Sequence, residues 1–406
     1  MAVTKAMGTI SKKEYVAPKE GSKLFNKYFC IILLMGAAVN FANYIVGSAF
    51  SLWVVDAGGS NTTYGVIHSL YSLVILLARP VAGWIIDHGN RRQAFIVASV
   101  IFVATMFLML YSPVFGIFVG ARLAMGAGNG CAVQMTNTVG FDYMPKDKMD
   151  RGIGYVTLIS SLMSALTATI SVGTYKSHGP SALVWMSAAA MVVAVVLSFF
   201  LVMRVPEGHG EKFRLKDVFD LSKLFEVRSV KPALVSAFST YFGFGLRSYV
   251  ILYGRSLGFA NPGWFTTASA LGLLVVRFIL DRIPLTEKSK DRRVFFAFAV
   301  FVVYLVTISM CNSFVVYIIA ALLWSVLFGI LTPTLQSVAI KAAPLERRGA
   351  ASSTFHCASD IGIIVGSFLG GKLSDIFGYS KMFLFGLIPV VLSFIYYAAV
   401  LRDRKE

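Results

Sequence analysis

The stretch RPVAGWIIDHGNRR, residues 79–92, closes a long apolar run with a glycine, a carboxylate and two basic residues. Its centre returns in the second half of the chain, where the segment that ends at Asp87 is matched by one that ends at Asp281. A charged turn after Pro145 is matched in the same way by one after Pro344, and the matching positions lie 194 to 199 residues apart. The sequence therefore predicts two similar halves.

Composition places both halves in a membrane. The chain of 406 residues is 57% apolar and 14% charged, with a mean hydropathy of +0.72. Soluble domains average roughly 45–50% apolar and about 25% charged residues, so a soluble globule is excluded. Each membrane-spanning helix takes about 20 residues. The chain can therefore hold on the order of twelve spans, which leaves no room for a sizeable catalytic domain outside the membrane.

Apolar runs bounded by charge, proline or glycine predict where these helices lie. We expect them at 26–55, 63–86, 93–111, 114–142, 152–175, 180–203, 230–255, 263–281, 294–311, 314–342, 349–373 and 380–401. The expected domains are a tail at 1–25, an N-terminal bundle at 26–203, a linker at 204–229, a C-terminal bundle at 230–401 and a tail at 402–406. The predicted fold class is an all-α polytopic membrane protein with twelve transmembrane helices in two pseudo-symmetric six-helix bundles.

Basic residues predict the orientation of the bundles. Of the 37 Lys and Arg residues, 29 fall in the two tails and in the loops after the even-numbered spans, whereas four lie on the opposite side. Cytoplasmic loops collect basic residues, so both termini and the linker are predicted to be cytoplasmic, with the bundles in the plasma membrane. The net charge of +17 then needs no nucleic acid partner. The first span is expected to remain as an uncleaved anchor.

Polar side chains are spread unevenly over the spans. The interiors of spans 3, 6, 9 and 12 hold no charged, amide or imidazole side chain, so these spans are expected to face lipid, and the other eight to enclose a polar path. His356 and Asp360 lie four residues apart on one helical face and are the candidates for proton coupling. The candidate substrate-binding residues are Asn40, Asn43, Arg122, Gln134, Asn137, Arg247 and Gln336.

The stretch at 79–92 resembles the loop pattern after helix 2 in the major facilitator superfamily. Arg122-Leu-Ala-Met-Gly126-Ala-Gly128 is similar to the superfamily's helix 4 motif, and the region 333–378 resembles bacterial sugar- and drug-efflux permeases. The resemblance covers essentially the whole chain and implies the superfamily's fold. It also implies gating roles for Arg79, Gly83, Asp87, Arg91, Arg277, Asp281 and Arg348. Helix 5 lacks the Gly-Pro pair that is usual in efflux antiporters, which leaves the direction of transport open.

Several candidates have a structural alternative. Asp87 is either a latch between the halves or a solvated helix cap, and Asp281 either a second latch or the partner of Arg277 in a local ion pair. Arg122 and Arg247 either clamp an anionic substrate, which their planar guanidinium groups suit, or tie neighbouring helices together. The pair of His356 and Asp360 either carries a proton or simply packs against other helices.

The expected function is secondary transport of a small organic solute, anionic or zwitterionic, by alternating access, coupled to protons or to a counter-substrate. Multidrug or sugar efflux by proton antiport is the alternative within this class, and a membrane sensor that does not transport is the alternative from another class. An enzyme is not expected, because HExxH and GxSxG motifs are absent. The four cysteines show no CxxC spacing, so neither a metal nor a cofactor is expected. The expected partners are the small-molecule substrate and the lipid bilayer, with the protein as a monomer.

Overall fold

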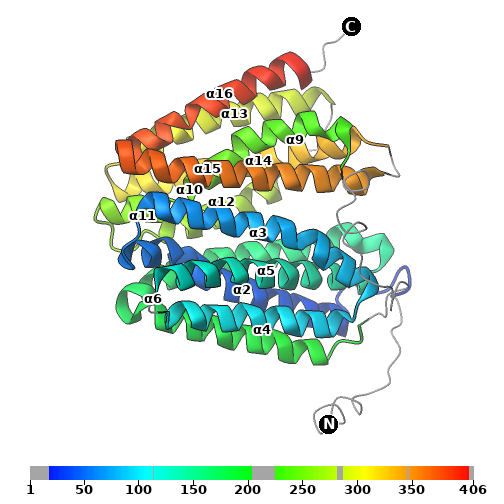
Figure 1. Ribbon diagram of the computed structural model, residues 1–406. Helices are drawn as coiled ribbons and strands as arrows, with labels where there is room; N and C mark the ends of the chain where they lie inside the picture. Colours follow the sequence, from blue (N-terminus) through cyan, green and yellow to red (C-terminus); the bar gives the residue numbers. More distant parts are fainter. Residues whose placement is uncertain (1–17, 113, 204–224, 281–286, 345–346, 402–406) are drawn as a thin grey trace.

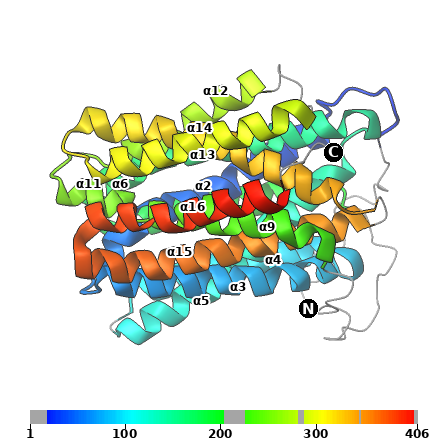
Figure 2. The same cartoon turned by 90° about the horizontal axis from the view of Figure 1, so that it is seen from above.

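Figure 1 shows the computed structural model of the chain, which describes residues 18–112, 114–203, 225–280, 287–344 and 347–401. These residues form helices and turns, and the described ranges contain no strand. The N-terminal half, in blue to green, is drawn below the C-terminal half, which ends in red. Figure 2 gives the view from above, in which the long helices of both halves again run side by side.

The N-terminal half consists of five long helical elements. They are α2 (Lys27–Asp56), α3 (Asn61–His88), α4 (Arg91–Leu110), α5 (Phe115–Asp142) and α6 (Met149–Phe199), with a 3-10 turn at Lys146–Lys148 before α6. Polar caps start three of them, since the side chains of Asn26, Ser60 and Asn90 each accept a hydrogen bond from the backbone N–H three residues later. Such caps satisfy N–H groups that a helix cannot pair internally. The capping residues in the sequence thus mark where these three helices begin.

The C-terminal half starts with a broken helix. Its parts are a 3-10 turn at Val227–Ser229, α9 (Val230–Ser236), a π-helical turn at Ala237–Tyr241, α10 (Phe242–Arg247) and α11 (Val250–Ser256). We call these parts together the broken helix. It is followed by α12 (Trp264–Leu280), α13 (Glu287–Ser309), α14 (Phe314–Lys341), α15 (Arg348–Phe385) and α16 (Leu387–Tyr396), with a last π-helical turn at Tyr397–Leu401.

Two elements are too long to be single spans. Seven described helices are long and apolar enough to cross a membrane, and two of these segments contain 49 and 52 residues, more than twice what one crossing requires. Each is bent at a glycine with positive φ, Gly179 in the first (70°) and Gly378 in the second (78°). Glycine adopts this backbone conformation without steric cost. The bends divide each segment into two helices, which is consistent with the predicted twelve spans.

The halves meet mainly along two pairs of helices. The helix α3 packs against α15, and α6 packs against α12. The bundle has two ends, which we name by the helices. At the inner end, on the right in Figure 1, α3 ends and α9 and α15 begin; at the outer end α2 ends and α3 begins. The inner end is the one that the sequence predicts to be cytoplasmic.

Glycines on α15 allow it to lie directly against the broken helix. A Cβ atom on Gly362 would collide with the carbonyl oxygen of Ala237, and one on Gly366 would collide with that of Phe242. The spacing of four residues puts both glycines on the same helical face. These glycines therefore serve close packing within the C-terminal half, as expected for small residues at helix interfaces in membranes.

Candidate functional site: a cavity between the halves and a closed seam

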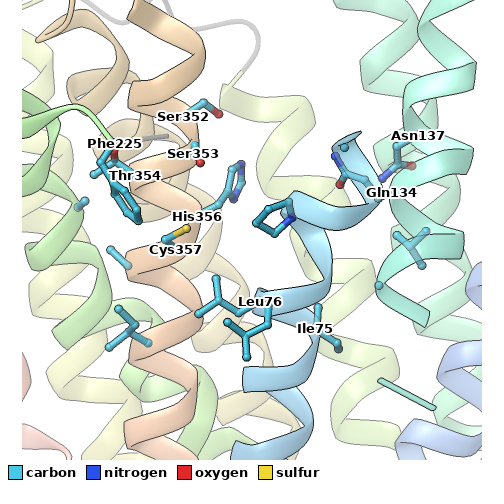
Figure 3. A pocket seen from close by; sticks show the side chains of 18 of the residues that line it. Ile75, Leu76, Gln134, Asn137, Phe225, Ser352, Ser353, Thr354, His356 and Cys357 are labelled. Carbon is cyan, nitrogen blue, oxygen red and sulfur yellow. The ribbon is translucent and has the colours of Figure 1, made fainter. Parts of the chain in front are cut away.

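A cavity of about 1130 Å³ lies between the two halves. It extends from the middle of α3, at Ile75, to the inner end, where Trp84 and His88 of α3 and Phe225 and Val230 of the C-terminal half form its rim. Figure 3 shows its walls from close by. A pocket of this size suits a small organic molecule. The cavity therefore belongs to the inner part of the interface.

The wall from the N-terminal half carries amide groups. Gln134 and Asn137 of α5 line the cavity, as does Gly83 of α3, and Figure 3 shows the two amides side by side. Asn129, a third lining amide, is 5% exposed and donates a hydrogen bond from Nδ2 to the hydroxyl of Tyr71 at 2.9 Å. The sequence prediction omitted Asn129, although it follows the helix 4 glycine motif directly.

The wall from the C-terminal half carries hydroxyl, thiol and imidazole groups. Ser352, Ser353, His356 and Cys357 of α15 line it (Figure 3). The side chain of His356 is exposed, and its Nε2 lies 3.5 Å from Nε2 of Gln336 on α14. The structure thus brings together two predicted residues, and His356 lies across the cavity from the amides of α5 (Figure 3).

Asp360 lies outside the cavity lining to which His356 belongs. Its side chain is 8% exposed, and it is not among the described residues that line the cavity. It lies one turn beyond His356 on α15, deeper between the helices. The proton-coupling role that the sequence assigns to this pair stays a prediction.

Arg122 is enclosed by aromatic rings. Its guanidinium carbon lies 3.9 Å from the ring centre of Phe50 and 4.0 Å from that of Tyr71, and the residue is 3% exposed. Its Nη1 lies 3.2 Å from Sδ of Met125, and its Nε has no hydrogen-bond partner. No described carboxylate lies within ion-pair distance of it. The charge is therefore balanced by ring faces, an arrangement that stabilises desolvated cations by about 2 kcal/mol.

Arg247 has a similar environment in the other half. Its Nη2 donates to Ser269 Oγ at 2.6 Å, and the rings of Phe244, Phe265 and Trp324 each lie 5.6 Å from its guanidinium carbon. Neither Arg247 nor Arg122 is among the described residues that line the cavity. The structure does not bring them together there, and the anion clamp stays a prediction.

The two asparagines of α2 also lie away from the cavity lining. Asn40 donates from Nδ2 to the carbonyl of Gly36 at 2.8 Å, and its Oδ1 accepts from Ser160 of α6 at 3.2 Å. Asn43 is half-buried on the same helix. Neither is among the described residues that line the cavity. Asn40 in this conformation ties α2 to α6.

The predicted gating residues are only partly described. Arg91 is 8% exposed, donates from Nε to the carbonyl of Ile86 at 2.7 Å and pairs with Asp142 of α5 at 2.5 Å. This pair lies within the N-terminal half, and the sequence prediction omitted Asp142. Arg277 is exposed on α12. The side chains of Arg79, Asp87 and Arg348, and the whole of Asp281, lie outside the described part of the chain, so their gating roles stay predictions.

The outer part of the interface is closed by hydrogen bonds between the halves. Asp375 of α15 accepts bonds from the backbone N–H groups of Asn61 (3.2 Å) and Thr62 (2.7 Å) in the first turn of α3. The hydroxyl of Tyr379 donates to Oδ1 of Asn61 at 2.9 Å. Close backbone contact accompanies these bonds, since a Cβ atom on Gly371 would lie 2.6 Å from the carbonyl oxygen of Asn61. We call this contact of α3 with α15, together with the ion pair described next, the outer seam.

An ion pair closes the outer seam beside α2. Arg255 of the broken helix lies 2.7 Å from Asp56 at the end of α2, and Tyr175 donates to the same carboxylate at 2.9 Å. Lys176 of α6 donates to the carbonyl of Ala260 at 2.6 Å. The sequence prediction omitted this pair, although Asp56 and Arg255 end spans 1 and 7, which correspond in the two halves.

Two bundles of helices with a cavity at one end of their interface and a seam at the other define a membrane transporter of the two-bundle class. A family model confirms this from the sequence, since that of the Major Facilitator Superfamily matches residues 32–367. The chain belongs to the Major Facilitator Superfamily, and the predicted all-α polytopic membrane fold is confirmed, with which the count of twelve spans is consistent. It is a multi-pass membrane protein, in a family that is not enzymatic.

Two of the curated relatives are described as an export protein and an efflux pump. The chain is 23% identical to the staphylopine export protein of Staphylococcus aureus, over 86% of this chain and 90% of the relative. It is 24% identical to a multi-drug resistance efflux pump PmrA homolog of Lactococcus lactis, over 89% and 94%. Among solved structures, the nucleoside transporter NupG matches with a TM-score of 0.74 and 13% identity, over 91% of this chain and 100% of that one. A peptide transporter POT in complex with alafosfalin matches with 0.75 and 14%, over 95% and 96%. These structures share the fold.

Proposed function

We propose that this transporter exports a small organic solute from the cytoplasm by alternating access. The observation that carries the proposal is the asymmetry of the interface, with a cavity of about 1130 Å³ at the inner end and a hydrogen-bonded seam at the outer end. In such a fold a rocking of the two halves closes one end as it opens the other. The structure then corresponds to the conformation that receives solute from the cytoplasm.

The free-energy cost of opening the outer seam follows from the contacts that hold it closed. The contacts that must break include the bonds of Asp375 to the start of α3, the bond of Tyr379 to Asn61, and the pair of Asp56 with Arg255. All of them lie near the outer end, where water can replace them. Exposed ion pairs and hydrogen bonds contribute only about 1 kcal/mol each. Solute binding in the cavity can therefore shift the equilibrium between the closed and the open seam.

Export as the direction is supported by the two curated relatives, which are described as an export protein and an efflux pump. The cavity walls support a solute with both polar and apolar parts. The amides of Gln134 and Asn137 and the imidazole of His356 can exchange hydrogen bonds with it, whereas Leu76 and Ile361 offer apolar contact. Multidrug or sugar efflux by proton antiport fits these walls as well, and it is the second candidate.

An anionic or zwitterionic solute is the finer proposal. Arg122 and Arg247 are cations inside the membrane, and the described residues place no carboxylate beside them. A carboxylate or phosphate group of the solute would supply the missing charge once the halves rearrange and the aromatic rings part. Proton coupling through His356 and Asp360 completes the proposal, because accumulation against a gradient requires a driving ion.

The test is transport by purified protein in liposomes, with a seam that can be locked. Asn61→Cys and Tyr379→Cys are combined in a background without the four native cysteines and bridged by a reducible bifunctional thiol reagent. A panel of amphipathic dyes, sugars and amino-acid-like zwitterions is offered. We expect one class to be transported, transport to stop when the seam is bridged, and transport to return after reduction.

Two results would contradict the proposal. Unchanged transport by the bridged protein would exclude alternating access at this seam. Binding of a solute by the purified protein without any movement across the membrane would instead support the sensor alternative.

A further inference from the structure

His68 holds a position that the proposed function leaves unused. It lies on α3 seven residues after Asn61 of the outer seam and seven residues before Ile75, the first α3 residue of the cavity wall. Seven residues correspond to about 10.5 Å along a helix. The half-buried imidazole therefore stands at the boundary between the closed seam and the cavity.

Hydrogen bonds across the interface hold α3 and α15 together at this level. His68 Nδ1 lies 3.1 Å from Oγ of Ser367 on α15, and Ser69 donates to the carbonyl of Ile364 at 2.8 Å. Within the C-terminal half, Tyr249 of the broken helix donates to the carbonyl of Ser367 at 2.5 Å and so fixes α15 at this level. The contact of His68 with Ser367 joins the two halves, so it exists only while the halves are closed here.

The charges around His68 are of one sign. Arg122 of α5 lies over the ring of Tyr71, which follows His68 by three residues on the same face of α3, and a cation nearby disfavours a second positive charge. The other titratable neighbours are tyrosines: Tyr64 of α3, whose ring centre lies 5.6 Å away, Tyr71 of α3 beneath Arg122, and Tyr249, which stands against Tyr64.

The acidic groups on the same helices lie further along them. On α15, Asp360 precedes Ser367 by seven residues and Asp375 follows it by eight, about 10.5 and about 12 Å along the helix. On α2, Asp56 is paired with Arg255 at the outer end. The closed interface therefore favours a neutral imidazole.

We propose that His68 is a proton-carrying residue of the transport cycle. With the seam closed, the imidazole is neutral and bonded to Ser367. When the halves part at the outer end, this bond breaks, water reaches the ring, and a ring nitrogen binds a proton from the outer solution. When the seam closes again, desolvation and the charge of Arg122 release the proton toward the cavity. One proton then moves inward for each solute exported, so the inference rests on the proposed function and adds to it a proton carrier at the boundary between the seam and the cavity.

The test measures the seam itself, without any substrate. Spin labels are attached at Tyr111 and Met310, the exposed residues that follow α4 and α13 at the outer end, 71% and 73% exposed, after replacement of the native cysteines. Electron spin resonance then gives the distance distribution in nanodiscs between about pH 8 and about pH 5, where histidine titrates. We expect acidification to move population from a short to a long distance at least fivefold.

Three variants make the result specific. His68→Gln keeps hydrogen-bonding groups but cannot titrate, and should abolish the response to pH. Ser367→Ala removes the partner and should keep the response but shift its midpoint upward, because the neutral imidazole loses its hydrogen bond. His178→Gln, at the exposed bend of α6 where His178 contacts Ser177, should respond as the wild type does.

The outcomes separate this inference from the proposed function. A His68→Gln protein with the wild-type response to pH would overturn the role of His68, as would a wild-type protein whose seam opens equally at all pH values. In both cases alternating access would stand. A seam that never opens, even when transported solutes are added, would instead contradict the proposed function.

Discussion

A single carboxylate, Asp375, pairs two of the N–H groups that begin α3. The first N–H groups of a helix have no partner within it, and Ser60 supplies one only to Thr63. Asp375 completes the cap for Asn61 and Thr62 from the other half of the molecule. The start of α3 is therefore fully paired only while the seam is closed, and a cap, normally a local feature, here depends on the conformation of the whole protein.

Removal of this cap should open the seam. Asp375→Ala deletes two hydrogen bonds and a negative charge at a helix N-terminus, which together stabilise the closed form by about 1–2 kcal/mol. The long-distance population between labels at residues 111 and 310 should rise about five- to thirtyfold. Asp147→Ala, which removes an exposed carboxylate at the inner end that accepts from Gly21, should leave that population unchanged. An unaltered distribution in Asp375→Ala would show that the cap does not hold the seam.

Arg247 is the candidate for recognition of an anionic group on the solute. If it recognises an anionic solute in one conformation, Arg247→Gln should weaken binding of a carboxylate- or phosphate-bearing ligand by about 1.5–3 kcal/mol, the range for hydrogen bonds to charged groups. Arg247→Lys keeps the positive charge, so its binding of the same ligand should weaken less. Calorimetry on the purified proteins measures both. Equal affinity in all three would mean that the aromatic box around Arg247 is purely structural.

Glycines of α15 take part in two kinds of helix contact, one within the C-terminal half and one between the halves. Gly366 lies against the backbone of Phe242 within the C-terminal half, whereas Gly371 lies against Asn61 of the other half. A methyl group at either position must displace backbone, which costs about 1–3 kcal/mol in a packed interface. The cost has different consequences in the proposed cycle, because that cycle breaks the contact of Gly371 and keeps the contact of Gly366.

Matched alanine substitutions should reveal this difference. Gly366→Ala should lower the melting temperature of the purified protein in every conformation. Gly371→Ala should change the melting temperature less, and should instead enlarge the open-seam population in the spin-label measurement. If both variants lose stability equally and neither opens the seam, the distinction between the two contacts is wrong.

The sequence predicted helical elements well because each long apolar run has one stable structure in a membrane, a helix that pairs its own backbone. The run at 230–255 was predicted as one span, but the structure breaks it with a π-helical turn at Ala237–Tyr241. Such turns depend on neighbouring backbone, here the close approach of Gly362 to Ala237. A periodic pattern carries no information about that contact.

For the whole molecule, the sequence indicated which residues are costly to bury but not where they meet. Gln134, Asn137, Gln336 and His356 do come together around the cavity or beside it, because they face inward from helices of both halves. Arg122 lies against aromatic rings instead, because a guanidinium group can be stabilised by rings that no motif identifies. The seam contacts were missed, since they pair residues that are far apart in the sequence and belong to different halves.

Energy coupling involves the whole protein, and Asp360 gives the prediction that tests it. If Asp360 binds and releases a proton during the cycle, Asp360→Asn should abolish accumulation driven by a pH gradient while downhill exchange continues. Both are measured in liposomes with and without an imposed gradient. Accumulation by the variant would make Asp360 structural and leave His68 as the coupling residue. A wild-type protein that ignores the gradient would indicate exchange or facilitated diffusion.

The bends at Gly179 and Gly378 have a consequence for how the protein is made. They lie 199 residues apart, the same interval as that between Pro145 and Pro344. Each reverses the chain between two apolar helices with a single residue of left-handed backbone and almost no loop. So tight a connection leaves no polar loop between the two helices of a pair that could be held outside the bilayer. We therefore expect each pair to enter the membrane during synthesis as a preformed hairpin, once in each half.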